Sequence, residues 1–270
     1  MNSREIIETQ IIYEMDQTIT LYLIESEITE LPIGIFDGLT NLCILHIAEN
    51  KITKLPELPM GIFDKLINLE ELSLESNQIT ELSIGIFDRL INLILLNLSC
   101  NQITELPTNI FDKLINLEEL SLESNQITEL PIGIFDRLTN LKELDLGSNE
   151  ITELPMGIFD RLTKLQNLDL WGNEITEMSI DIFDELINLQ ELNLGDNGMI
   201  VGLDLLVGIF SELTNLTKLN LSYNKITNLP KGIFDGLTNL QHINLINNSL
   251  ETIHLSTKEF LKNNNIEVIL

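Results

Sequence analysis

The sequence predicts an α/β solenoid with one concave parallel β-sheet and short helical or irregular segments on the convex side. Nearly every repeat keeps the same frame of leucines, and self-similarity at a fixed period is typical of architectures in which each turn buries its apolar residues against its neighbours. Nine asparagines mark the period, at steps of 24 residues with two steps of 27: Asn50, Asn77, Asn101, Asn125, Asn149, Asn173, Asn197, Asn224 and Asn248. Nine phenylalanines follow the same spacing: Phe36, Phe63, Phe87, Phe111, Phe135, Phe159, Phe183, Phe210 and Phe234.

Each element of the repeat can be justified from one example, 141–149, which reads LKELDLGSN. Its Leu-x-Leu segment alternates with period two, which indicates a short strand whose leucines point inward. The asparagine can both donate and accept hydrogen bonds, so we expect it to satisfy backbone groups where the chain leaves the sheet. The phenylalanines are expected to fill the convex side with stacked rings.

The second half of the repeat reads LPMGIFDRLTKL from residue 154. The frame Leu-Pro-x-Gly-Ile-Phe-Asp-x-Leu resembles the 24-residue class of leucine-rich repeat found in Toll-like receptor ectodomains and variable lymphocyte receptors. The resemblance covers 18–253 and implies a curved leucine-rich-repeat solenoid of about ten turns. Extracellular members of this class close their ends with cysteine-rich caps, which this sequence lacks.

We expect a single domain, because nothing is left over for a catalytic module. The C-terminal cap should contain a short helix from Ser256 to Asn263 that carries Phe260 over the last turn. The final residues, IEVIL, form an apolar and strand-prone tail that offers an open edge for self-association unless it is packed. The expected division is an N-terminal cap at 1–17, repeats at 18–253 and a C-terminal cap at 254–270.

Composition restricts the partners and the compartment. The chain has 42 acidic and 15 basic residues and a net charge of −27, which argues against nucleic acid and anionic membranes as ligands. The start, MNSREIIETQIIYEMDQ, has no unbroken apolar run of the kind found in secretory signals. Cys43 and Cys100 lie in repeats that are not neighbours, so no disulfide is expected. An intracellular, cytoplasmic location is favoured, and non-classical secretion as an effector is the alternative.

The sequence gives little support to an enzyme. It has no Gly-rich phosphate loop and no Cys/His cluster, and its histidines, His46, His242 and His254, stand at scattered repeat positions. We therefore expect no catalytic residues, no cofactor and no metal. The favoured function is a scaffold or adaptor that binds another protein on its concave face, where the strand residues between the leucines are free to vary.

The middle of that face is acidic. Glu119 is expected beside Glu143, and Asp145 beside Asp169, each pair about 5 Å apart across neighbouring strands. Like charges at this separation repel, and a basic partner would relieve the repulsion. The single tryptophan lies on the same face, and exposed indoles are common interface hot spots. The candidate partner-binding residues are Glu119, Glu123, Glu143, Asp145, Asp169 and Trp171, with Tyr22 and His46 in the more apolar first zone.

Three alternatives remain open at this point. A chain this acidic carries carboxylates on all its surfaces, so the middle zone need not be a site. The near-identical repeats and the apolar tail also suit a structural or self-assembling protein. Asp145 and Asp169 could instead share a divalent ion in a metal-dependent binder, although neither lies in a loop with known ligand spacing.

The insertion at 198–210 is a separate open point. It is either an irregular turn or an exposed apolar bulge.

Overall fold

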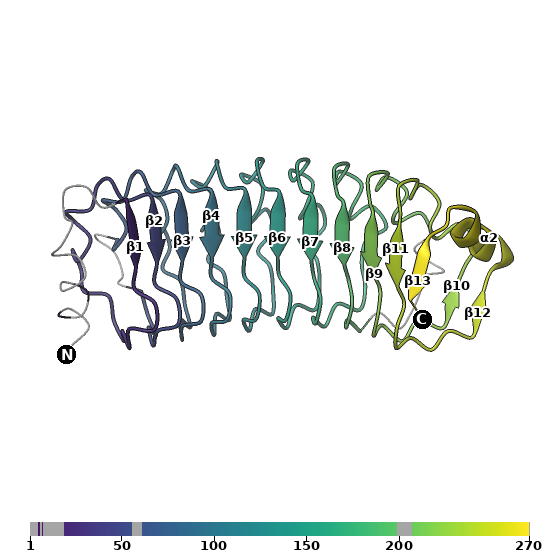
Figure 1. Ribbon diagram of the computed structural model, residues 1–270, viewed down its shortest axis with the longest axis horizontal. Helices are drawn as coiled ribbons and strands as arrows, with labels where there is room; N and C mark the ends of the chain where they lie inside the picture. Colours follow the sequence, from purple (N-terminus) through teal and green to yellow (C-terminus); the bar gives the residue numbers. More distant parts are fainter. Residues whose placement is uncertain (1–4, 6, 8–18, 56–60, 199–206, 270) are drawn as a thin grey trace. The chain divides into compact units, whose positions relative to one another are not determined.

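A computed structural model describes residues 5, 7, 19–55, 61–198 and 207–269, which group into two compact units, 1–141 and 142–270. Within each unit the neighbouring strands pair in parallel, so equivalent residues of successive repeats lie side by side, as Leu45 does beside Leu72 (Figure 1). The predicted parallel solenoid is confirmed. Unit 1 contains β1 (Thr20–Tyr22), β2 (Ile44–His46), β3 (Glu71–Ser73), β4 (Leu95–Asn97) and β5 (Glu119–Ser121). Unit 2 contains β6 (Glu143–Asp145), β7 (Asn167–Asp169), β8 (Glu191–Asn193), β9 (Lys218–Asn220), β11 (His242–Asn244) and β13 (Glu267–Ile269), with the short pair β10 (Asn228–Leu229) and β12 (Thr252–Ile253) beside them.

The core is built from the predicted rows. The central residue of each repeat's strand, a leucine in all but β11, points inward and is buried, while the residues on either side of it point to the outer face of the sheet. On the opposite side, the nine phenylalanines of the repeats are buried, and rings of neighbouring repeats stack in both units. The ring centroids of Phe36 and Phe63 lie 6.5 Å apart, and those of Phe159 and Phe183 lie 6.4 Å apart. The rings therefore form a structural spine in each unit.

The asparagine ladder is also confirmed. Asn101 is only 7% exposed, and its amide nitrogen donates to the carbonyl oxygens of Leu74, Leu98 and Ser99 at 3.0 to 3.1 Å. Its amide oxygen accepts the backbone N–H of Ile79 at 3.0 Å. One side chain thus satisfies backbone groups of two successive repeats, which explains why no other residue type serves at the regular positions.

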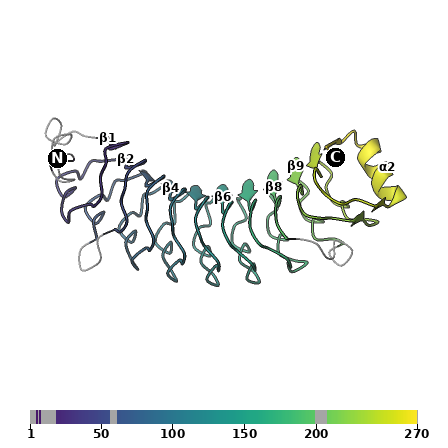
Figure 2. The ribbon, with the colours of Figure 1, turned by 90° about the horizontal axis from the view of Figure 1, so that it is seen from below.

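The segments around each phenylalanine are tight turns (Figure 2). In one of them the amide of Leu66 donates to the carbonyl of Phe63 at 2.9 Å, and that of Leu69 donates to Leu66 at 3.0 Å. The aspartate after Phe63 folds back, and its carboxylate accepts the backbone N–H of Gly61 at 3.0 Å. These contacts hold the side of each repeat that lies away from the strands.

The C-terminal cap has the expected helix, α2 (Leu255–Asn263), which begins after the N-cap residue His254. The tail that follows is packed: β13 pairs in parallel with β11, with Val268 beside Ile243. Near the N-terminus, Glu5 is exposed and Ile7 is fully buried, and the rest of the predicted 1–17 cap lies outside the described residues. Most of the insertion at 198–210 also lies outside them, so its two interpretations stay open.

Two further expectations can be compared with the structure. Cys43, which is partly buried, and Cys100, which is exposed, are both free cysteines. No helix in the described part of the chain is long and apolar enough to cross a membrane. The single-domain division at 17 and 253 is not tested and stays a prediction.

Candidate partner-binding surface

The outer face of unit 2 carries four of the predicted site residues, Glu143, Asp145, Asp169 and Trp171, and we call these four the acidic face. Glu143 and Asp145 lie on β6, Asp169 ends β7, and Trp171 follows two residues later. Asp145 is in register with Asp169, as predicted, so two carboxylates stand side by side on neighbouring strands. The structure therefore brings these four predicted residues to one surface.

Both aspartates also have a local structural role that the sequence analysis missed. One carboxylate oxygen of Asp145 accepts the backbone N–H of Gly147 at 2.9 Å, and one of Asp169 accepts that of Trp171 at 2.8 Å. Aspartate and asparagine commonly accept a bond from the backbone two residues on, and this ends the strand in a turn. The signal was present in the sequence, since the same strand position holds Asn193, Asn220 and Asn244 in the next repeats.

A row of side-chain hydrogen bonds joins these positions. The amide nitrogen of Asn220 donates to the side-chain oxygen of Asn193 at 2.8 Å, and that of Asn193 donates to the second carboxylate oxygen of Asp169 at 2.8 Å. Bonds that donate to a carboxylate are stronger than bonds between neutral groups, and bonds in series polarise one another. The Asp169 carboxylate is thereby held in one orientation on the surface.

Trp171 packs beside Gly195, which follows β8 by two residues. The indole is 39% exposed, and its Cδ1 atom would lie only 2.9 Å from a Cβ atom at Gly195. The same Cβ would lie 2.9 Å from the Asn220 amide nitrogen and 3.1 Å from the Ser222 hydroxyl oxygen. A side chain at position 195 would therefore force the indole and its polar neighbours to shift. Sequence reasoning found the tryptophan but not the glycine beneath it.

Two glutamates on this surface each contact a side chain of the next strand. Glu143 accepts a bond from the Asn167 amide nitrogen at 3.3 Å, and Glu191 pairs with Lys218 at 2.6 Å. An exposed ion pair of this kind contributes little stability, but it cancels one negative charge on β8. Asp145 and Asp169 are the carboxylates that lie side by side in register on β6 and β7.

The other four predicted residues lie in unit 1. Glu119 and Glu123 are exposed at β5 and just after it. Because Glu119 and Glu143 belong to different units, their expected pairing stays a prediction. Tyr22 and His46 meet edge to face, with ring centroids 5.1 Å apart, and the His46 Nε2 atom lies 3.7 Å from a Glu71 carboxylate oxygen. These two rings form a separate cluster from the carboxylates of β5.

On the side of the repeats that carries the phenylalanines, neighbouring carboxylates shift the pKa of one aspartate. Desolvation and, after it, the nearby carboxylates of Glu212 and Asp181 raise the pKa of the Asp184 carboxyl above its ordinary value of 3.8. Glu185 and Asp160 act in the same direction. Asp181 stands where most other repeats have glycine, and it accepts a hydrogen bond from the Ser179 hydroxyl.

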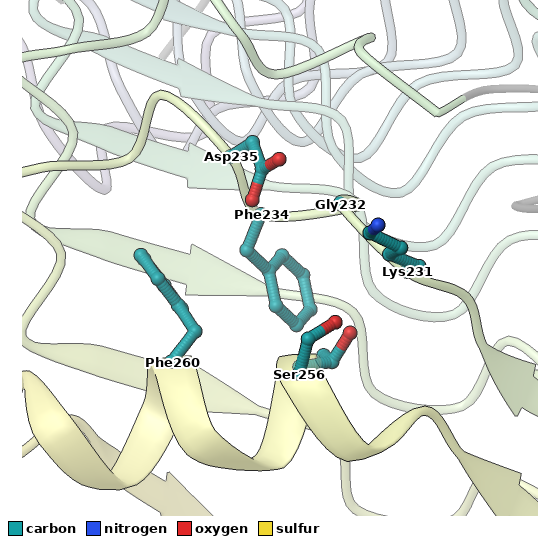
Figure 3. Close-up of a pocket in the computed structure, with 7 residues that line it drawn as sticks. Lys231, Gly232, Phe234, Asp235, Ser256 and Phe260 are labelled. Atoms are coloured by element: carbon teal, nitrogen blue, oxygen red, sulfur yellow. The ribbon is translucent and has the colours of Figure 1, made fainter.

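A small pocket of about 150 Å³ lies where α2 packs on the last repeat, with Phe234 and Phe260 among its lining residues (Figure 3). The Thr257 hydroxyl at its edge donates to the carbonyl of Pro230 at 2.7 Å. Binding pockets for drug-sized ligands are larger, at roughly 300 Å³ and above. Among the described residues, no three His, Cys, Asp or Glu side chains are grouped so that they could hold a metal ion. The pocket is best explained as a packing gap between α2 and the last repeat.

Comparisons with known proteins agree with this architecture. A model described as leucine rich repeat matches residues 67–127, 115–175 and 214–267, and a two-copy leucine-rich-repeat model matches 40–85. No curated protein sequence matches the chain.

Two similar solved structures extend this comparison. One is a chain of the octameric complex of Latrophilin 3 (Lec, Olf), Unc5D (Ig, Ig2, TSP1) and FLRT2 (LRR), with 29% identity, a TM-score of 0.75, and coverage of 92% of this chain and 72% of that chain. The other is the LRR protein LIC12759 of Leptospira interrogans, with 27% identity, a TM-score of 0.67, and coverage of 99% and 74%.

Proposed function

Because the chain belongs to the leucine-rich-repeat family, we propose that it is a non-enzymatic interaction module that binds a basic protein on the acidic face. The observation that carries the proposal is the register of Asp145 and Asp169, two carboxylates side by side next to an exposed indole. Positive groups of a partner would relieve the repulsion between the carboxylates. Tryptophan is the side chain most enriched at interface hot spots.

Three lines of support come from outside this surface. Leucine-rich repeats match more than half of the chain, and a similar structure belongs to a complex of several proteins. The strong negative charge favours basic partners and disfavours nucleic acid and anionic membranes. The proposal extends to Glu119 and Glu123 as partner-binding residues of unit 1, and to a cytoplasmic location.

The test uses two labelled peptides of equal length, one in which arginine alternates with glycine and one in which glutamate replaces the arginine. Fluorescence anisotropy should detect binding of the basic peptide only, and the affinity should fall as salt is raised. Asp145→Asn with Asp169→Asn should lower the affinity about fivefold at low salt, since exposed charge pairs contribute up to about 1 kcal/mol. The salt dependence should flatten as well.

Glu153→Gln with Glu177→Gln is the matched control, because these two exposed carboxylates also lie one repeat apart in unit 2 but outside the acidic face. The control should bind the peptide with the affinity of the unchanged chain. Equal losses in both double variants would show that total charge, rather than this surface, attracts the peptide, and the proposal would then be abandoned.

A second candidate function is self-association through the tail. β13 is the last strand in the order of the unit 2 sheet and pairs on one side with β11. Glu267 donates its N–H to Gln241, so by alternation the N–H of Val268 points away from β11. Sedimentation would detect a dimer, and Val268→Pro should abolish it by removing that donor. A chain that stays monomeric at high concentration would exclude this candidate.

A further inference from the structure

The exposed tryptophan of the acidic face is positioned by Asp169, which ends β7, and by Gly195, which lies just after β8. Its backbone N–H donates to Asp169, and its ring edge lies against Gly195, whose lack of a side chain leaves the space for it. An exposed tryptophan normally samples several rotamers, and ordering it on binding costs free energy. Here the seat beside Gly195 favours one orientation before any partner arrives.

The carboxylates lie next to this platform. Asp169 precedes Trp171 by two residues on the same face, and Asp145 is its register partner. Asn193 and the Trp171 N–H together hold both oxygens of Asp169. A ligand group that used the whole acidic face would have to stack on an aromatic ring and donate hydrogen bonds to carboxylates at the same time.

Of the two basic side chains, only arginine meets both requirements. Its guanidinium is planar, stacks on aromatic faces and presents several N–H groups in a fork that matches carboxylates. The lysine ammonium is a compact, strongly hydrated point charge, which satisfies the carboxylates but gains less from the ring. Cation–π contact at an exposed site contributes about 0.5–1 kcal/mol.

We infer that the acidic face selects an arginine of its partner, whose guanidinium stacks on Trp171 and donates to Asp145 and Asp169. Gly195 is a positioning residue in this arrangement, because it acts only through the indole. The inference rests on the proposed function and deepens it: the carboxylates supply attraction to any basic segment, and the seated indole supplies the choice of arginine over lysine.

The experiment compares three labelled peptides that differ only in the residue alternating with glycine: arginine, lysine, or citrulline, the neutral counterpart of arginine. The arginine peptide should bind about two- to fivefold more tightly than the lysine peptide, in line with the cation–π contribution. The citrulline peptide should not bind measurably. Emission of the single tryptophan should change with the arginine peptide, which reports contact at the site itself.

Gly195→Ala alters the space beside the indole, and beside the Asn220 amide, without changing charge. The added Cβ should displace the indole, so the preference for arginine over lysine should fall towards one while the salt dependence remains. Gly38→Ala is the matched control, since a Cβ there meets nothing within 4 Å. Trp171→Leu, read by peptide anisotropy, gives the same test without depending on whether Gly195→Ala folds.

The outcomes distinguish the two proposals. Equal affinities for arginine and lysine peptides, both weakened by Asp145→Asn with Asp169→Asn, would overturn the arginine inference and leave the proposed function standing. An unchanged arginine preference in Trp171→Leu would also overturn the inference. If neither peptide binds the unchanged chain, the proposed function fails, and the inference fails with it.

Discussion

Two rows of asparagine and aspartate side chains lie close together in this protein and have different structural roles. The inner row, which includes Asn101, is buried, and each amide bonds to the backbone of two successive repeats. The outer row, which includes Asn193 and Asn220, is only partly buried, and each side chain bonds to the backbone two residues on. The same type of side-chain hydrogen bond thus belongs to the core in the inner row and to the candidate binding surface in the outer row.

The difference lies in what surrounds the hydrogen bonds. When an inner amide is removed, the backbone groups it served are left without water. When an outer amide is removed, solvent can replace the bond, since the row lies on the open face of the sheet. The comparison predicts that the inner row governs stability and that the outer row can vary for function at small cost.

The largest effect should come from breaking the inner row. Asn101→Ala removes the amide oxygen that accepts the backbone N–H of Ile79. It also removes the amide nitrogen that donates to three carbonyl oxygens, and all of these groups are buried. Each buried group left unpaired costs about 1–3 kcal/mol, so we expect a loss of about 2–4 kcal/mol in the free energy of unfolding. Urea denaturation would measure it, and a loss below about 1 kcal/mol would contradict the proposed division of roles.

A smaller effect is expected in the outer row. Asn220→Ala removes the acceptor for the Ser222 N–H and hydroxyl and the donor to Asn193. Because water can replace part of these bonds, the loss should be about 0.5–1.5 kcal/mol in the same urea experiment. A loss as large as that of Asn101→Ala would show that the outer row is as structural as the inner one, which would weaken the binding assignment.

The smallest effect concerns a carboxylate group on the phenylalanine side. Asp181→Asn keeps an acceptor for Ser179 but removes one of the charges that raise the pKa of Asp184. A raised carboxyl pKa means that the folded state disfavours the ionised form, so the penalty is present above the folded pKa and absent below 3.8.

The melting temperature of Asp181→Asn should therefore rise slightly at about pH 7 and stay unchanged at about pH 3. Calorimetry at both pH values would measure this. A gain of equal size at both would show that the cause is not the charge of Asp184. A rise at pH 7 alone would show that the closely spaced carboxylates around Asp184 lower the stability of the fold. The carboxylates of the acidic face differ from them, because neighbouring amides donate hydrogen bonds to them.

Most of the fold was predictable from the sequence because each repeat packs against neighbouring repeats of nearly the same sequence. A leucine, asparagine or phenylalanine that recurs at a fixed step must contact its own counterparts in the neighbouring turns, so the buried rows and the parallel register follow from the spacing alone. Asp145 and Asp169 were placed side by side by the same reasoning, and the structure confirms it. The family match is confirmed as well, while the 24-residue class stays a prediction.

The local geometry of the acidic face was not predictable in this way. The seat of Trp171 depends on Gly195, a residue of the next repeat, and the orientation of Asp169 depends on Asn193 and Asn220. These contacts join equivalent positions of successive repeats, 24 or 27 residues apart, where the residue types differ, so periodicity shows which positions are neighbours but not how their unlike side chains bond.

The sequence by itself therefore determined the solenoid, the buried rows and the face on which variable residues gather, since all of these follow from repetition. Only the tertiary structure decided which acidic residues also hold the backbone, how the indole is seated and that the tail completes the sheet as β13. The physical reason is that repetition fixes contacts between equivalent positions. Contacts between unlike side chains depend on the particular neighbours that stacking brings together.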